Sequence, residues 1–214
     1  MVIIIQNYNW MFVDYKVVIY LEEKSELVKK FLTHANDLKI YSDDDNIKYK
    51  EIIKKQLLNS SELLYFLNSK EFDWYTEPDM FFGTNIKPYL LVPEIQSSTQ
   101  NYICYKIDFS ETPRYSENLK YADIIFVILC AKETSIEPKT GLPRHDLLAH
   151  IIKDNFNWTN LFGNQCRLVS EKESVTDSNF TTRTLIFELT TTNSLTKNGK
   201  VLGQGLNYNT RGSL

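Results

Sequence analysis

Histidine and glycine are scarce in this chain of 214 residues, which has three histidines (His34, His145 and His150) and seven glycines. Histidine-rich metal centres and glycine-rich phosphate loops need clusters of residues that the sequence does not contain. A nucleophile elbow, a dinucleotide-binding glycine pattern and a Cys/His pairing at a known spacing are absent as well. The sequence therefore predicts a protein that is not an enzyme and needs no cofactor.

A surplus of basic charge and long hydrophobic runs are also lacking. The 24 lysines and arginines face 27 aspartates and glutamates, whereas domains that bind nucleic acid are usually basic. The charge balance therefore gives no support to a generic nucleic-acid binder, although a channel that lets DNA slide past could still be mildly acidic. The longest apolar run, residues 124–131, is too short to cross a bilayer, and residues 1–13 lack the basic start of a signal peptide. We expect a soluble protein, made in a cytoplasm, with no membrane partner.

Cysteine is limited to Cys104, Cys130 and Cys166, which are odd in number, far apart and placed within apolar or strand-like runs. This pattern predicts buried reduced thiols rather than a disulfide framework or a thiolate metal site.

The other metal motifs are incomplete. His145 and Asp146 match part of the metal-binding pair of phosphohydrolases, but the further ligands are missing. Asp146 and His150 stand one turn apart on a predicted helix, which supplies two ligands only, so a helix-surface pair is expected. The three aspartates at residues 43–45 lack the central glycine and distal glutamate of a calcium loop and predict a solvated turn. No metal site is predicted.

What the sequence does contain is a hydrophobic pattern typical of an α+β fold. It predicts a mostly antiparallel sheet of about four to five strands with a helix packed across it, plus an N-terminal helical region. Three parts are expected: an N-terminal strand and helix extension (residues 1–45), a core domain (46–190) and an extended C-terminal arm (191–214).

In the first third, β-branched residues predict a strand at residues 16–21, and Ser25 then caps a helix. The apolar stripe of that helix is Leu27, Val28, Phe31 and Leu32. After the aspartate turn, the spacing predicts further helix from Ile47 to Leu67. Residues 73–84 are aromatic and irregular, and we expect a loop tucked against the core.

The remaining core pattern alternates between strands and one helix. Residues 86–96 predict a strand at a sheet edge or at a bulge, because Pro88 and Pro93 cannot donate ladder hydrogen bonds. Residues 102–109 predict a strand whose polar face, Tyr102, Cys104, Lys106 and Asp108, meets water or a neighbour. Residues 123–131 predict a central strand covered on both faces, followed by a helix at residues 144–156. Strands at residues 165–169 and 180–189 complete the sheet, with Leu185, Phe187 and Leu189 inward and Arg183 and Glu188 outward.

The C-terminal arm cannot build a core of its own, because residues 190–214 hold four of the seven glycines and no acidic residue. We expect it to dock onto another chain through Val201, Leu202, Leu206 and Tyr208, with Arg211 nearby. The same is predicted, more weakly, for Ile3, Ile4 and Ile5.

One pair of acidic residues has the spacing of a nuclease metal site. Asp79 followed by Glu94 on a strand resembles the spacing with which some magnesium-dependent nucleases hold their metal, although the basic third residue is absent. The sequence thus leaves open a nuclease of this kind, or an α+β adaptor that binds one peptide.

The order of elements, and the run from Gly141 to Ile152 after a buried strand, resembles tail-terminator, tail-completion and neck connector proteins of tailed bacteriophages. In these proteins an arginine and aspartate pair, here Arg144 and Asp146, commonly opens the helix that packs across the sheet. The likeness covers about residues 46–189.

The resemblance implies a structural virion protein that forms a ring of six or twelve copies in the phage neck, terminates the tail and joins it to the portal side of the head. Its partners would be further copies of itself, portal or connector proteins and tail-tube proteins. Since closed rings need two different complementary patches per subunit, we expect an interface among the following residues: Trp74, Phe81, Phe82, Tyr102, Lys106 and the terminal residues named above.

Overall fold

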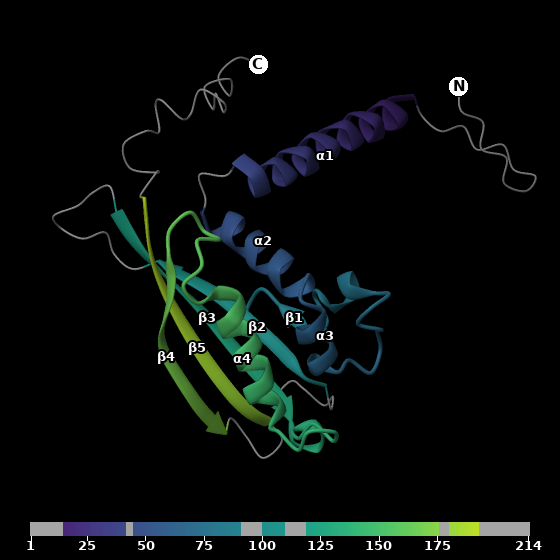
Figure 1. The fold of residues 1–214 in the computed structure, drawn as a ribbon. Coiled ribbons are helices and arrows are strands. Elements are labelled where there is room, and N and C mark those ends of the chain that lie inside the picture. Colours follow the sequence, from purple (N-terminus) through teal and green to yellow (C-terminus); the bar gives the residue numbers. More distant parts are fainter. Residues whose placement is uncertain (1–14, 42–44, 91–99, 110–118, 176–179, 193–214) are drawn as a thin grey trace, which may run out of the picture. The chain divides into compact units, whose positions relative to one another are not determined.

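The computed structural model describes residues 15–41, 45–90, 100–109, 119–175 and 180–192, and the chain divides into two compact units, Met1–Ser42 and Asp43–Leu214 (Figure 1). The first unit contains one helix, α1 (Tyr15–Tyr41). The second contains the remaining helices and a five-stranded sheet. The predicted α+β class is confirmed.

Helix α1 corrects the prediction of a strand at residues 16–21, and Ser25 lies inside the helix instead of capping it. The β-branched residues Val17, Val18 and Ile19 favour a strand locally. However, residues 15–41 contain no proline or glycine, and adding one residue to an existing helix is far easier than starting a new one. The local preference for a strand is therefore overridden by the helix that continues through it.

Two helices open the second unit as the apolar spacing predicts, α2 (Asp45–Leu58) and α3 (Ser61–Leu67). The Ser60 hydroxyl accepts a hydrogen bond from the Leu63 backbone N–H and caps α3 at its start. Asn68 ends the helix in the left-handed conformation, with φ of 50°. The aromatic segment that follows is irregular apart from the short 3-10 helix η1 (Pro78–Phe81).

The sheet has the strand order β1-β2-β3-β5-β4, and only the β1–β2 pair is parallel. Its strands are β1 (Ile86–Lys87), β2 (Tyr102–Phe109), β3 (Leu119–Ala131), β4 (Cys166–Val175) and β5 (Phe180–Thr192). Strand β3 is central and β1 lies at an edge, as predicted. Strand β1 ends at Lys87 immediately before Pro88, so it is shorter than predicted, and residues 91–96 of the expected strand lie outside the described residues.

Helices α2 and α4 (Arg144–Phe156) contact one face of this sheet, and α3 packs on α4 (Figure 1). The aromatic centre of that face joins three elements, because the Phe126 ring lies 5.0 Å from Phe156 on α4 and 5.8 Å from Phe187 on β5. The inward positions predicted for Leu185, Phe187 and Leu189 are confirmed by their burial in this core.

The other sheet face, called the open face below, is formed by even-numbered residues of β2 and β5 and odd-numbered residues of β3. On it Ile125, Val127 and Ile186 are half-buried, so the prediction that β3 is fully covered on both sides holds for the helix side only. At one end of the open face a second cluster is buried: Tyr102, Cys104, Leu129, Ala131 and Phe180. The polar side of β2 is therefore exposed only toward Asp108.

Strand β5 brings a further correction. Arg183 shares the face of Leu185 and Phe187, toward the helices, and not the face of Glu188. Strand β4 also runs to Val175 instead of ending at Val169, because its charged residues Glu171 and Glu173 find partners in Arg183.

Candidate functional site

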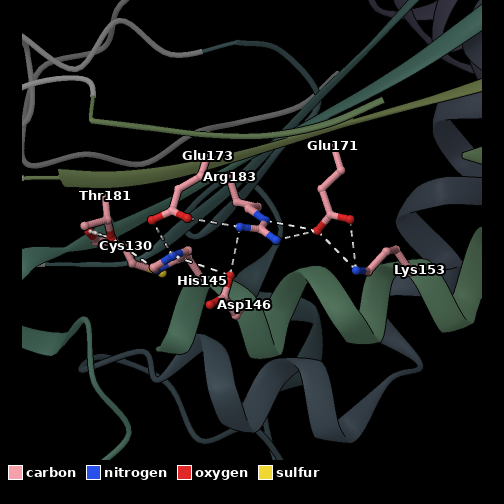
Figure 2. Close-up of polar contacts among 8 residues, drawn as sticks. All are labelled: Cys130, His145, Asp146, Lys153, Glu171, Glu173, Thr181 and Arg183. Atoms are coloured by element: carbon pink, nitrogen blue, oxygen red, sulfur yellow. Dashed lines mark hydrogen bonds and ion pairs between the residues drawn. The ribbon is translucent and has the colours of Figure 1, made fainter. Parts of the chain in front are cut away.

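A cluster of ion pairs joins α4 to β4 and β5, and Arg183 is its centre (Figure 2). Its guanidinium donates to Glu171 at 2.7 and 3.0 Å and lies 3.2 Å from Asp146 and 3.3 Å from Glu173. Lys153 approaches the same Glu171 carboxylate at 3.1 Å. Three carboxylates from two elements thus share two cations, which fixes the helix on the strand pair.

The pKa values in this cluster reflect pairing more than burial. Burial by itself raises the pKa of Glu171, but hydrogen bonds from Arg183 and Lys153 outweigh it and hold that pKa below its usual value. Burial likewise lowers the pKa of Arg183, yet Glu171, Asp146 and Glu173 together raise it. Both groups are therefore charged at neutral pH.

His145 and Cys130 border the cluster without forming a catalytic pair. The buried His145 ring lies 3.4 Å from the Thr181 hydroxyl through Nδ1, and its Nε2 lies 3.5 Å from Asp146 and 3.6 Å from Glu173. Burial raises the pKa of the Cys130 thiol to about 12, an effect that the charge of Arg144 opposes, so the thiol stays protonated at neutral pH. Cys104, Cys130 and Cys166 are buried and form no disulfide, as predicted.

The prediction that Asp146 and His150 pair with each other on the helix surface is wrong. His150 is exposed and lies 3.3 Å from Asp154, whereas Asp146 pairs with Arg183. Within the described residues, no group of three or more histidine, cysteine, aspartate or glutamate side chains is arranged to hold a metal ion.

Arg144, one half of the pair that carries the phage resemblance, is locked inside the protein. Its guanidinium donates to Glu137 at 2.7 Å, to the Phe66 carbonyl at 2.8 Å and to the Thr134 carbonyl at 2.9 Å. Both charged side chains are more than nine-tenths buried. Arg144 therefore ties the start of α4 to the end of α3 and to the loop before α4.

The aromatic segment predicted as an interface divides into core and surface residues. Phe81 is only 1% exposed and packs in the core, and Phe82 is half-buried beneath the Lys54 ammonium at 4.6 Å. Trp74 and Tyr75 are exposed, and Tyr75 shows 75% of its surface. Of the predicted residues in this segment, Trp74 is the one whose side chain is available to a partner.

The open sheet face carries a row of acidic residues that strand pairing brings together. Asp108, Asp123 and Glu188 lie at paired positions on adjacent strands, and Arg167 pairs with Glu188 at 3.0 Å. Burial, Glu188 and Asp108 together raise the pKa of Asp123. A hollow of about 620 Å³ adjoins this row, lined by Tyr121, Asp123, Gln165, Arg167, Glu188, Leu189 and Thr190.

Two interface residues predicted on β2 lie on this face. Tyr102 is buried in the second cluster, beneath the Lys87 ammonium, and Lys106 is half-buried and pairs with Asp108. Strand pairing is what aligns Asp123 with Asp108 and Glu188, and no spacing within the sequence reveals that alignment.

Helix α1 has an apolar stripe that no other described residue of its own unit, Met1–Ser42, covers. Leu27, Val28, Phe31 and Leu32 are between 44% and 65% exposed, although the i, i+4 spacing places them on one side of the helix. Side chains of this size are normally buried, and a contiguous exposed group indicates an interaction surface.

Several predicted residues lie outside the described residues: Ile3, Ile4, Ile5, Glu94, Val201, Leu202, Leu206, Tyr208 and Arg211. Asp79, the other half of the predicted nuclease pair, is exposed on η1. The nuclease and adaptor alternatives therefore stay predictions.

These observations define an α+β protein with one helix-covered sheet face and exposed apolar side chains on α1 and the aromatic segment. A sequence model of the YomW family matches residues 25–189, and the chain belongs to that family. The family name is phage-derived, and the protein is phage-associated. No curated protein matches the chain. Among the described helices, none combines the length and apolar character that a bilayer crossing requires.

Proposed function

We propose that this protein is a structural component of the phage virion, which forms an oligomeric ring in the neck, terminates the tail and joins it to the portal side of the head. The α+β fold with a helix across the sheet and the phage-associated family both support this assignment. In this role the protein binds copies of itself, connector and tail-tube proteins, and does not catalyse a reaction.

The uncovered apolar stripe of α1 carries the proposal. Exposing four large apolar side chains costs a protein solubility and stability unless a partner covers them, at about 25 cal/mol for each Å² of apolar surface. A ring whose subunits contact each other head to tail needs two different patches on each subunit. The α1 stripe and the open sheet face are two such patches, and they differ in shape and charge.

Native mass spectrometry of the purified full-length chain, combined with negative-stain electron microscopy, tests the proposal. The expected result is a discrete species of six or twelve copies that appears as an annulus with a central opening. A chain that stays monomeric at tens of micromolar, or that cleaves plasmid DNA in a manner abolished by Glu94→Ala, contradicts it.

A further inference from the structure

We propose that α1 of one copy docks, through its apolar and lysine-bearing side, onto the open sheet face of a different copy. This inference deepens the proposed ring function and rests on it. It identifies the two surfaces that meet between neighbouring subunits, of which the sequence-based interface includes only Tyr102 and Lys106 on the open face.

The receiving surface has an apolar strip beside an acidic row. Ile125, Val127 and Ile186 are half-buried, so their outer sides remain available to a partner. The next row on the same face contains Asp108, Asp123 and Glu188. An apolar strip with charges along one side suits an amphipathic helix laid across it.

Asp123 is the carboxylate in that row that still needs a cation. Asp108 pairs with Lys106 and Glu188 with Arg167, whereas no cation of the described residues pairs with Asp123. Its neighbours on both sides are acidic, and burial together with these neighbours raises the pKa of Asp123. A lysine brought to this position from outside would neutralise the row and enter the adjoining hollow of about 620 Å³.

Helix α1 supplies the matching side chains. Over its whole length it carries five lysines, Lys24 and Lys30 among them, against four acids. At 100° per residue, Lys24 lies within the Leu27–Val28–Phe31 stripe and Lys30 lies at its border. Glu26 pairs with Lys29 at 2.8 Å away from the stripe. Lys24 therefore places one positive charge within the apolar side of α1.

The aromatic segment, another surface with exposed apolar side chains, does not fit the same place. Between Lys70 and Met80 it holds four acids, Glu71, Asp73, Glu77 and Asp79, against one lysine. Bringing this segment to the acidic row would place like charges together, which opposes docking. Charge thus selects α1 over the aromatic segment as the occupant of the open face.

A disulfide cross-link between two variants, each with one added cysteine, tests the contact directly. The three native cysteines are buried, so Phe31→Cys and Ile125→Cys introduce the accessible thiols. When the two full-length variants are mixed under mild oxidation, the expected product is a heterodimer joining residue 31 of one copy to residue 125 of the other. Phe31→Cys homodimers alone, a bond formed within a monomer of the double variant, or no bond would each overturn the docking.

A charge exchange gives an independent readout. Asp123→Lys and Lys24→Asp each place like charges opposite each other and should weaken self-association at least tenfold in native mass spectrometry titrations. The combined variant should recover most of that loss, because the pair is restored in reverse. Phe31→Glu should weaken association similarly, while Thr33→Glu on the opposite side of α1 is the matched control and should not.

Circular dichroism melting of each variant excludes unfolding as the cause. The outcomes also separate this inference from the ring itself. If the wild-type chain is monomeric, the proposed ring fails, whereas a normal ring that tolerates Phe31→Glu and Asp123→Lys overturns only the docking of α1.

Discussion

At the scale of single residues, buried charge in this protein is structural. The Arg144 guanidinium donates three hydrogen bonds, one of them to Phe66 far away in sequence, and Glu137 is its only carboxylate partner among the described contacts. Burying a charge costs several kcal/mol unless it is paired, so the two side chains depend on each other. The arginine that carries the family resemblance thus acts by holding the loop before α4 in place.

Removing one half of this pair should be costly. We expect Glu137→Gln to lower the free energy of unfolding by about 3–5 kcal/mol, because it leaves the Arg144 guanidinium buried without a counter-charge. Urea denaturation followed by circular dichroism measures the change. Glu133→Gln, in the same loop but exposed, is the matched control and should shift stability by less than about 0.5 kcal/mol.

Trp158 has an unusual backbone conformation. It has a positive φ of 63°, although its side chain is 63% exposed and gains little packing in return. The left-handed conformation costs a residue with a Cβ atom about 1–2 kcal/mol. We expect Trp158→Gly to raise the free energy of unfolding by about 1 kcal/mol, measured by chemical denaturation. Trp158→Ala keeps the Cβ atom and should not stabilise, and equal effects of the two variants would refute this account.

At the scale of elements, two helices of similar amphipathic pattern have opposite roles. Helix α4 buries its stripe against β3 and β5 and secures its polar side with the cluster around Arg183. Helix α1 shows an equally regular stripe that remains exposed. The pattern along a helix thus predicts an apolar face, and for α4 the tertiary structure shows which strands cover that face.

The attachment of α4 should weaken in acid. The Glu171 pKa is lower in the folded protein than in the unfolded chain, so its stabilising effect is complete above the unfolded value near 4.5 and is lost as pH falls through the folded pKa. We expect Glu171→Gln to destabilise the protein by about 1 kcal/mol at pH 7. Below the pKa of Glu171 in the folded protein the effect should be much smaller. Thermal melts recorded at several pH values measure both. Glu173→Gln, at a more exposed carboxylate with one contact to Arg183, is the control and should show a smaller change. A pH-independent difference for Glu171→Gln would contradict the linkage.

At the scale of the whole molecule, assembly is the property that the exposed surfaces favour. Repeated weak contacts around a ring add up, because each later contact forms between partners already held together. The described part of the chain offers the α1 stripe and the open face, and the C-terminal arm is predicted to add a third contact.

Deleting residues 193–214 tests the arm. We expect the truncated protein to keep the melting temperature of the full chain within about 2 °C, because the core lies within residues 45–192, while ring or neck assembly weakens. Electron microscopy of assembled particles and differential scanning calorimetry measure the two properties. Unchanged assembly by the truncated chain would remove the arm from the proposal.

The sequence by itself determined the elements with strong periodicity. The helix at residues 144–156, the alternation of residues 102–109 and the apolar run at residues 124–131 are local signals, and the structure has α4, β2 and β3 there. Burial of the three cysteines follows from the apolar or strand-like segments in which they lie. The strand predicted at residues 16–21 failed because three β-branched residues are a weaker signal than the helix around them.

Only the tertiary structure decided which side chains meet. Sequence spacing says nothing about strand partners, so the alignment of Asp108, Asp123 and Glu188 and the placement of Arg183 beside Asp146 depend on register between segments far apart in the chain. Burial of Phe81 and exposure of Trp74 depend in the same way on which neighbours arrive. The physical reason is that periodicity fixes the face on which a residue lies, while packing across the sheet fixes what that face encounters.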